Sequence, residues 1–188
     1  MAYQQQKRQW YTLMKATLFG SFGVLGVLFT LAFFLVQTLI HPRKRTLFDL
    51  YTFTPYELGL PGEAVAFPPR QGDYQVSGWY IPYPGATTTI LLSPGYRSKA
   101  DDLLRLAAPI WRAGHTLLVF EYYGHGTPVG TPVTLGYREL NDFLGAVAYA
   151  KARAPQNRLG VLGCSMGASV AIMAGAQSTD VEAFLLDS

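Results

Sequence analysis

Apolar residues follow different patterns along the chain, and each pattern predicts a different kind of element. A run without any charge extends from Ala16 to Ile40. As a helix it would be roughly 37 Å long, enough to cross the hydrocarbon core of a bilayer. Short apolar runs typical of strands buried in a sheet follow at residues 65–67, 75–81, 89–92, 116–120, 158–162 and 181–186. Apolar residues at helical spacing, or runs of small residues, predict helices at 99–113, 137–154 and 168–174.

The order of these elements predicts an α/β fold. From the third strand onward, strands and helices alternate, which implies a mostly parallel sheet with right-handed crossovers and helices on both faces. Pro109 is expected to kink the helix at 99–113 or to split off its last turn. We therefore divide the chain into an N-terminal flank (1–15), a transmembrane helix (16–40), a juxtamembrane segment (41–64) and a globular domain (65–188) with six strands.

The apolar run at 16–40 is interpreted as a single membrane span, which makes the bilayer a partner of the chain. A secretory signal peptide is the competing interpretation, but the run is longer than usual for one and no small-residue cleavage site follows. Trp10 and Tyr11 before the run, and the cluster from His41 to Arg45 after it, suit the membrane interface. Three basic residues stand on each side, so the side on which the domain lies is unresolved.

Composition narrows the chemistry. The net charge of +3 comes largely from the two flanks of the apolar run, which suits anionic lipid headgroups better than a nucleic acid. The single cysteine, Cys164, excludes an internal disulfide and any multi-cysteine metal site, and we interpret it as a small buried residue. The sequence contains no phosphate-binding glycine loop, metal cluster or nucleotide motif, so we infer no cofactor.

The five residues from Gly163 to Gly167 carry the candidate chemistry. They follow an apolar strand and precede a helix, so Ser165 is expected at the carboxyl end of a strand, where open α/β sheets place their active sites. A serine on such a tight turn becomes a nucleophile when a histidine takes its proton. Two glycines would let the strand and helix backbones pass closely. The alternative is a strand-to-helix turn that contains a serine by chance.

These elements together resemble the α/β-hydrolase fold over roughly residues 57–188. Residues 93–98 follow the third strand where the family often carries a His-Gly-aromatic oxyanion loop, and residues 121–126 follow the fourth where Asp-Tyr-Arg-Gly-His-Gly is common. Within the family the chain looks most like membrane-anchored hydrolases of the serine aminopeptidase-like branch. Pro94 and Glu121 depart from the common pattern. The resemblance implies that the backbone amides of Tyr96 and Met166 form the oxyanion hole.

The family's triad also needs an acid and a histidine after the serine, and this sequence has no histidine there. His41 and His115 are poor candidates by position. His125 lies on a loop at the correct end of the sheet, but in the family this histidine is usually structural, so it is a weak candidate base. Asp187, at the catalytic end of the last strand, is a weak candidate acid.

We therefore expect the chain to be incomplete at its C-terminal side. Its last strand would be an apolar, unpaired edge, suited to pairing with a missing C-terminal part. The first hypothesis is a membrane-tethered serine hydrolase that cleaves a small acyl ester, or less favourably an amide or peptide, through an acyl-enzyme on Ser165. The second is a non-catalytic remnant or interaction module that has the sheet but lacks the histidine.

Overall fold

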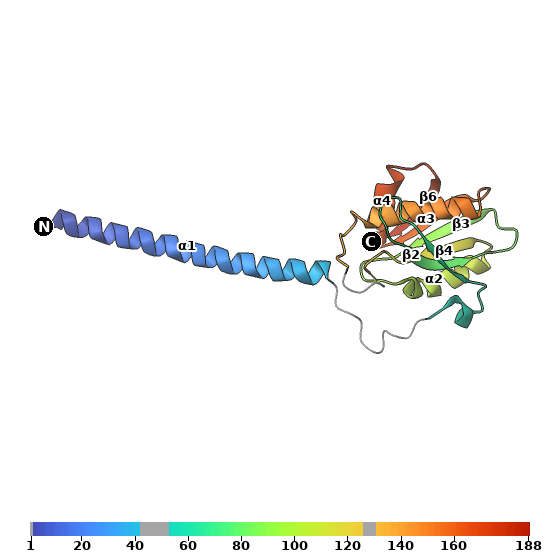
Figure 1. Ribbon diagram of the computed structural model, residues 1–188, viewed down its shortest axis with the longest axis horizontal. Helices are drawn as coiled ribbons and strands as arrows, with labels where there is room; N and C mark the ends of the chain where they lie inside the picture. Colours follow the sequence, from blue (N-terminus) through green and yellow to red (C-terminus); the bar gives the residue numbers. More distant parts are fainter. Residues whose placement is uncertain (1, 42–52, 126–130) are drawn as a thin grey trace. The chain divides into compact units, whose positions relative to one another are not determined.

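The computed structural model describes residues 2–41, 53–125 and 131–188, and it divides into two units, Met1–Leu39 and Ile40–Ser188. The first unit is formed by α1 (Ala2–Ile40), one continuous helix that includes both the predicted flank and the predicted span (Figure 1). Its apolar part has a mean hydropathy of 2.3 and is not buried. The helix is therefore a candidate membrane span, although a signal sequence near an N-terminus has the same properties.

Threonine hydroxyls in α1 are satisfied within the helix. The Oγ1 atoms of Thr30 and Thr38 donate to the carbonyl oxygens of Gly26 and Phe34, each at 2.8 Å, and Thr17 bonds the preceding turn in the same way. Hydrocarbon offers no partner for a hydroxyl, so such internal bonds lower the cost of placing threonine in a bilayer.

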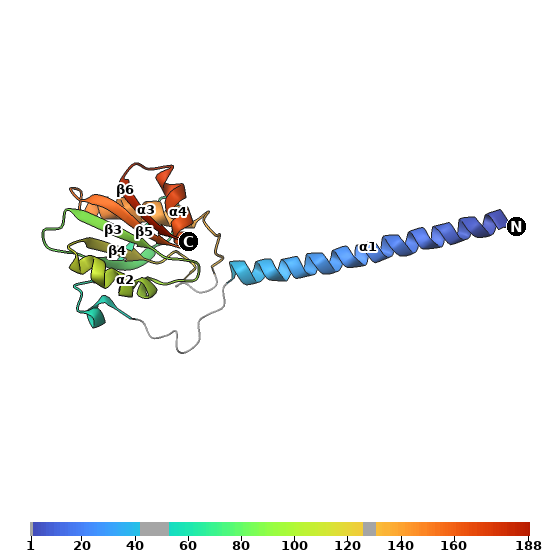
Figure 2. The same cartoon turned by 180° about the vertical axis from the view of Figure 1, so that it is seen from behind.

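The second unit is built on one six-stranded sheet with the order β1-β2-β4-β3-β5-β6 (Figures 1 and 2). Antiparallel pairing joins β1 to β2 and β2 to β4, whereas β4, β3, β5 and β6 run parallel. The predicted mostly parallel sheet is confirmed. Its strands are β1 (Glu63–Phe67), β2 (Val76–Ile81), β3 (Thr88–Ser93), β4 (Thr116–Phe120), β5 (Arg158–Cys164) and β6 (Val181–Asp187).

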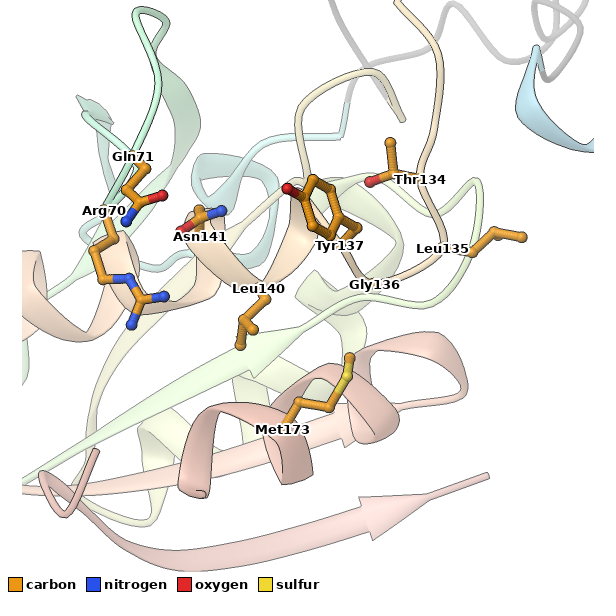
Figure 3. A pocket seen from close by; sticks show the side chains of 9 residues that line it. All are labelled: Arg70, Gln71, Thr134, Leu135, Gly136, Tyr137, Leu140, Asn141 and Met173. Carbon is orange, nitrogen blue, oxygen red and sulfur yellow. The ribbon is translucent and has the colours of Figure 1, made fainter. Parts of the chain in front are cut away.

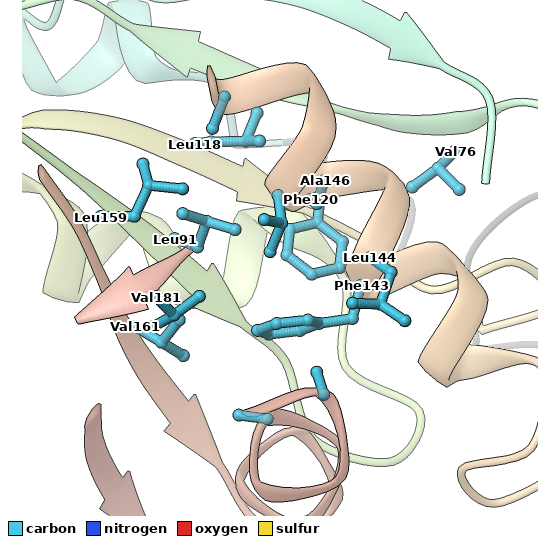
Figure 4. Close-up of a cluster of buried hydrophobic side chains, with 14 of the residues drawn as sticks. Val76, Leu91, Leu118, Phe120, Phe143, Leu144, Ala146, Leu159, Val161 and Val181 are labelled. Atoms are coloured by element: carbon cyan, nitrogen blue, oxygen red, sulfur yellow. The ribbon is translucent and has the colours of Figure 1, made fainter. Parts of the chain in front are cut away.

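Helices cover both faces of this sheet, as predicted. Successive side chains of a strand point to opposite faces. Leu91 of β3 accordingly packs in a cluster with side chains of α3 and α4, while Leu92 packs in a second cluster with side chains of α2. Figure 4 shows part of the first cluster, including Leu91, Phe120 and Phe143. The helices are η2 (Pro55–Leu58, a short 3₁₀ helix), α2 (Ala100–Arg112), α3 (Glu139–Arg153) and α4 (Met166–Gly175).

Several element boundaries differ by one or two residues from those expected. β1 begins at Glu63, two residues early, because it pairs with β2 from that residue onward. Helix α2 continues through Pro109 to Arg112, so the last turn is not split off. Helix α3 begins at Glu139 rather than at residue 137, because its first residue binds the loop that precedes it. The predicted basic residues Arg43, Lys44 and Arg45, and Gly126 of the turn after β4, lie outside the described residues.

Candidate active site

Ser165 stands at a sharp corner between β5 and α4. Its backbone has φ 52° and ψ −121°, a conformation that costs a residue with a Cβ atom about 1–3 kcal/mol. The next residue, Met166, begins α4, and the Ala168 N–H donates to the Ser165 carbonyl oxygen at 2.9 Å. The corner on which the sequence argument depends is therefore present.

The glycines on either side of the corner are required by space. A Cβ atom on Gly163 would lie 2.8 Å from the Ala168 Cα, so β5 and α4 could not approach as they do. A Cβ on Gly167 would lie 2.5 Å from the Pro94 carbonyl oxygen, and closer still to that of Ser93. Real Cβ atoms do not tolerate such distances to backbone, so the sequence pattern reflects the close passage of three segments.

The loop after β3 passes directly beside the serine. A Cβ atom on Gly95 would lie 3.3 Å from the Ser165 Cβ and 3.8 Å from its Oγ. Of the predicted oxyanion residues, Tyr96 follows Gly95 on this loop and Met166 follows Ser165 at the start of α4. The N–H groups of the first helical turn have no intrahelical acceptor, and the helix dipole makes this end electropositive. Both features favour a developing negative charge.

A buried hydrogen-bond network, which sequence reasoning missed, fixes the base of this loop. The Ser93 hydroxyl lies 2.6 Å from the Tyr122 hydroxyl and donates to the Gly167 carbonyl oxygen at 3.1 Å. Burial raises the pKa of Tyr122, so its phenol stays neutral. Residues from three elements are thus joined behind the corner. The tyrosine after Glu121 in the turn following β4 was the available signal.

His125 lies under the same loop, with both ring nitrogens facing residues other than Ser165. Its Nδ1 accepts the Arg97 N–H at 2.9 Å, and its Nε2 lies 3.3 Å from Glu139 Oε1. The Tyr96 ring packs edge-on against the imidazole. The histidine is buried and connects the loop after β3 to α3. These contacts do not support its assignment as the base, and they match the structural role expected from the family.

Glu139 is the second buried group of this connection, and no pattern in the sequence singled it out. Its carboxylate accepts the Thr134 N–H at 2.9 Å, the Thr134 hydroxyl at 2.6 Å and the Gly136 N–H at 2.8 Å. Burial acts to raise the pKa of Glu139, but the hydrogen bonds from His125 and Thr134 outweigh it and lower the pKa to about 2. The carboxylate is therefore ionised and holds residues 134–136 in place.

Asp187 touches the corner through its main chain. Cys164 and Asp187 are partners in the parallel pairing of β5 and β6, and the Ser165 N–H donates to the Asp187 carbonyl oxygen at 2.6 Å. Burial, together with the negative charge of Asp187, raises the pKa of Cys164, so this thiol remains protonated and suits a packing role. Asp187 thus lies at the edge where the parallel strands end, but none of the described hydrogen bonds connects it to a histidine.

The described residues also include no group of three or more His, Cys, Asp or Glu side chains that could hold a metal ion. The remaining histidine of the domain, His115, bonds the Thr88 hydroxyl at the start of β3, which is the opposite end of that strand from Ser93. The structure therefore brings together Ser165, Met166, the loop that contains Gly95, and the main chain of Asp187. It places His115 elsewhere.

Neither a comparison with protein-family models nor a search of curated proteins gave a match to this chain. Solved structures do resemble it. An esterase from Pyrococcus furiosus aligns in two crystal forms with TM-scores of 0.62 and 0.66, at 28% and 26% identity. These alignments cover 69% and 76% of this chain but 52% and 54% of the esterase, so the chain spans about half the length of that protein.

More distant structures share the architecture. A dienelactone hydrolase from Anabaena variabilis aligns with a TM-score of 0.58 at 20% identity, over 68% of this chain and 62% of its own. An α/β serine hydrolase without a lid, from Xanthomonas campestris, aligns with a TM-score of 0.55 at 19% identity, over 66% and 60%. At these identities the likeness concerns the fold. With its strand order, its corner at Ser165 and these neighbours, the second unit has the fold of the α/β hydrolases.

Proposed function

We propose that this chain belongs to a membrane-anchored serine hydrolase that cleaves an acyl ester through a covalent intermediate on Ser165. The observation that carries the proposal is the strained backbone of Ser165 at the carboxyl end of β5, beside the loop that contains Gly95. A protein keeps a strained residue only where the surrounding structure enforces it, and such residues cluster at functional sites. The esterase likeness at 26–28% identity supports ester cleavage over other hydrolyses.

The chemistry follows from the positions of the backbone amides. The Ser165 Oγ would attack the ester carbonyl carbon while a base removes its proton, and the carbonyl oxygen would become an oxyanion between Tyr96 and Met166. Each such donor typically lowers the barrier by about 3 kcal/mol. Collapse of this intermediate breaks the bond to the alcohol, which leaves with the proton. Water then attacks the acyl-enzyme and releases the carboxylic acid.

The base is proposed to come from outside these 188 residues. Both ring nitrogens of His125 contact other residues, Arg97 and Glu139, and His115 is hydrogen-bonded to Thr88. Asp187 stays the weak candidate acid. Pairing of a further strand on β6 would be one way to bring the missing histidine to the serine, because β6 already contacts Ser165.

The membrane anchor is supported by α1. Its apolar part is long enough to span a bilayer and carries internally bonded threonine hydroxyls. A span and a cleaved signal sequence are distinguished by expressing the full chain with an epitope before Met1 and extracting membranes with alkaline carbonate. Retention of the epitope on a membrane-bound chain supports the anchor. A soluble product that lacks the epitope would mean that α1 is a signal sequence.

Labelling with a fluorophosphonate tests the nucleophile, because only an activated serine reacts quickly with it. The protein encoded by the whole gene, including any part beyond these 188 residues, should be labelled in its native membrane. The Ser165→Ala variant of the same protein should lose the label. The matched control is Cys164→Ala, which changes the neighbouring residue but leaves the hydroxyl. Equal labelling of wild type and Ser165→Ala would contradict the assignment.

A non-catalytic remnant or interaction module is the second candidate, favoured by the contacts of His125 and by the exposed outer strand β6. The genomic reading frame after Ser188 separates the two. An acid and a histidine encoded after two more strands would support the enzyme, and a stop codon would support the remnant. A remnant would also show no label with the fluorophosphonate.

A further inference from the structure

A cavity of about 480 Å³ lies between the N-terminal end of α3, the C-terminal part of α4 and the turn after β1. Its lining residues do not include Ser165, Met166 or the loop at residues 93–97. Figure 3 shows three of its polar side chains, Arg70, Gln71 and Asn141, together on one side. Leu140 and Met173 line another side, and Leu135 and Tyr137 belong to the loop that precedes α3.

The loop from Thr134 to Tyr137 exposes large apolar side chains in an unusual way. Tyr137 is 81% exposed and Leu135 is 52% exposed. Leu135 also has a positive φ of 52°, a conformation that favours glycine or asparagine. Leucine is therefore unfavourable at this position both for its backbone conformation and for the exposure of its side chain to water. Neither feature contributes to the core. A leucine at this position requires a different explanation from packing within the domain.

This loop is held rigidly in its exposed position. The Glu139 carboxylate accepts N–H groups from Thr134 and Gly136, and the Met173 methyl is so close that a Cβ atom on Gly136 would lie 2.9 Å from it. Met173 is itself 38% exposed. The apolar side chains are therefore presented by a fixed backbone, which lowers the entropy lost when another surface covers them.

Two arginines accompany these apolar residues. Arg70 lines the same cavity, Arg138 directly follows Tyr137 in the chain, and both arginines are exposed. The backbone N–H of Arg70 donates to the Asn141 carbonyl oxygen, which ties its loop to α3, and its guanidinium donates to the Gln177 side chain at 2.9 Å through one of its nitrogens. Leucine and tyrosine beside arginine is a combination that suits the boundary between lipid headgroups and acyl chains.

We propose that this surface, defined by Arg70, Leu135, Tyr137, Arg138 and Met173, docks on an anionic lipid bilayer. The inference rests on the proposed function in one respect, namely that α1 spans a membrane. About fourteen residues separate α1 from η2 and extend at most about 50 Å, so the domain stays near the bilayer at high effective concentration. Under those conditions a small rigid patch with weak intrinsic affinity is sufficient for docking.

Docking would also affect which esters reach the proposed active site. Residues 134–139 are connected through Glu139 and His125 to the loop that contains Tyr96. A domain held on the bilayer by this surface would meet acyl esters that reside in or partition into the membrane.

The test uses the full chain in nanodiscs of phosphatidylcholine, with and without phosphatidylserine. A nitrobenzoxadiazole fluorophore is attached to Leu135→Cys in a Cys164→Ala background, and a lipid with a nitroxide headgroup serves as quencher. The matched control is Tyr56→Cys, because Tyr56 is 87% exposed on η2 and outside the proposed surface. We expect quenching at position 135 to be at least about twofold that at position 56, because a docked residue enters the headgroup region.

The anionic lipid should increase this difference, and Arg70→Gln with Arg138→Gln should remove the increase. Equal quenching at the two positions would overturn the docking proposal while leaving the membrane anchor intact. Failure of the chain to co-elute with nanodiscs would overturn the anchor and the docking together. A disulfide between two copies at position 135, with low quenching, would assign the surface to self-association and also overturn the proposal.

Discussion

Gly167→Ala probes the corner at Ser165 most directly. The added Cβ atom would lie 2.5 Å from the Pro94 carbonyl oxygen and also against that of Ser93. Both obstacles are backbone, so relief requires that α4 or the 93–97 loop move. Overpacking in a rigid core costs about 1–3 kcal/mol and occasionally more, and the loss of the bond from the Ser93 hydroxyl to the Gly167 carbonyl oxygen would add about 1 kcal/mol.

Gly175→Ala is the matched control in the same helix. Its Cβ atom would lie 3.0 Å from the Phe184 ring, a partly exposed side chain that can shift, and alanine gains about 1 kcal/mol of helix propensity. We expect Gly167→Ala to lose about 2–4 kcal/mol of unfolding free energy and Gly175→Ala to change by less than about 1 kcal/mol.

The assay is guanidinium unfolding of the full chain in detergent, followed by the fluorescence of Trp79 and Trp111 in the second unit, with the α1 residue Trp10 replaced by Phe. Fluorophosphonate labelling of the full-length gene product supplies the second measurement, and it should be lost in Gly167→Ala because the oxyanion loop is displaced. Equal stability and labelling of the two variants would refute the close passage of α4 and the 93–97 loop.

Three further predictions concern the same region. The free energy of unfolding of Ser165→Gly should be about 1 kcal/mol higher than that of Ser165→Ala, because glycine adopts φ 52° and ψ −121° without strain. An equal or lower value for Ser165→Gly in guanidinium unfolding would argue against a strained corner. The folded pKa of Glu139, about 2, lies below its unfolded value, so its contribution to the free energy of unfolding is fully present above about pH 4.5 and is lost as pH falls toward 2. Glu139→Gln should therefore reduce the loss of stability on the acid side of a stability–pH curve by up to about 3 kcal/mol. An unchanged acid side of the curve would contradict the role of this carboxylate. Tyr122→Phe should cost about 1 kcal/mol by removing the 2.6 Å bond to the Ser93 hydroxyl, whereas Tyr123→Phe should be nearly neutral, and the reverse order in thermal melts would contradict the network.

The sequence was sufficient for the parts of the fold that depend on local pattern. Buried strands such as 116–120 are short and, apart from Thr116, apolar because both faces are covered, and that pattern has few other interpretations. The corner at Ser165 was predictable because the two glycines flank it at fixed spacing. The order β1-β2-β4-β3-β5-β6 was not predicted, since nothing in the composition of β3 and β4 specifies which lies next to β2.

Contacts between distant segments were not predictable from the sequence alone. The bond between Ser93 and Tyr122 joins residues that are far apart in the chain, and a tyrosine in the turn after β4 does not by itself indicate its partner. Glu139 resembled any acidic residue in the first turn of a helix, where the dipole favours a negative charge. Its burial, and its role in holding residues 134–136, appear only when the loop is folded back over it.

The bond from the Ser165 amide to the Asp187 carbonyl oxygen has a mechanical consequence. The backbone of the serine is clamped on one side by the outermost strand of the described sheet, and the clamp is a single bond of 2.6 Å. Slippage of β6 along β5 would withdraw this acceptor and release the peptide unit before Ser165. The orientation of the Ser165 hydroxyl therefore depends on the position of β6, so any segment that pairs with β6 would also affect that orientation.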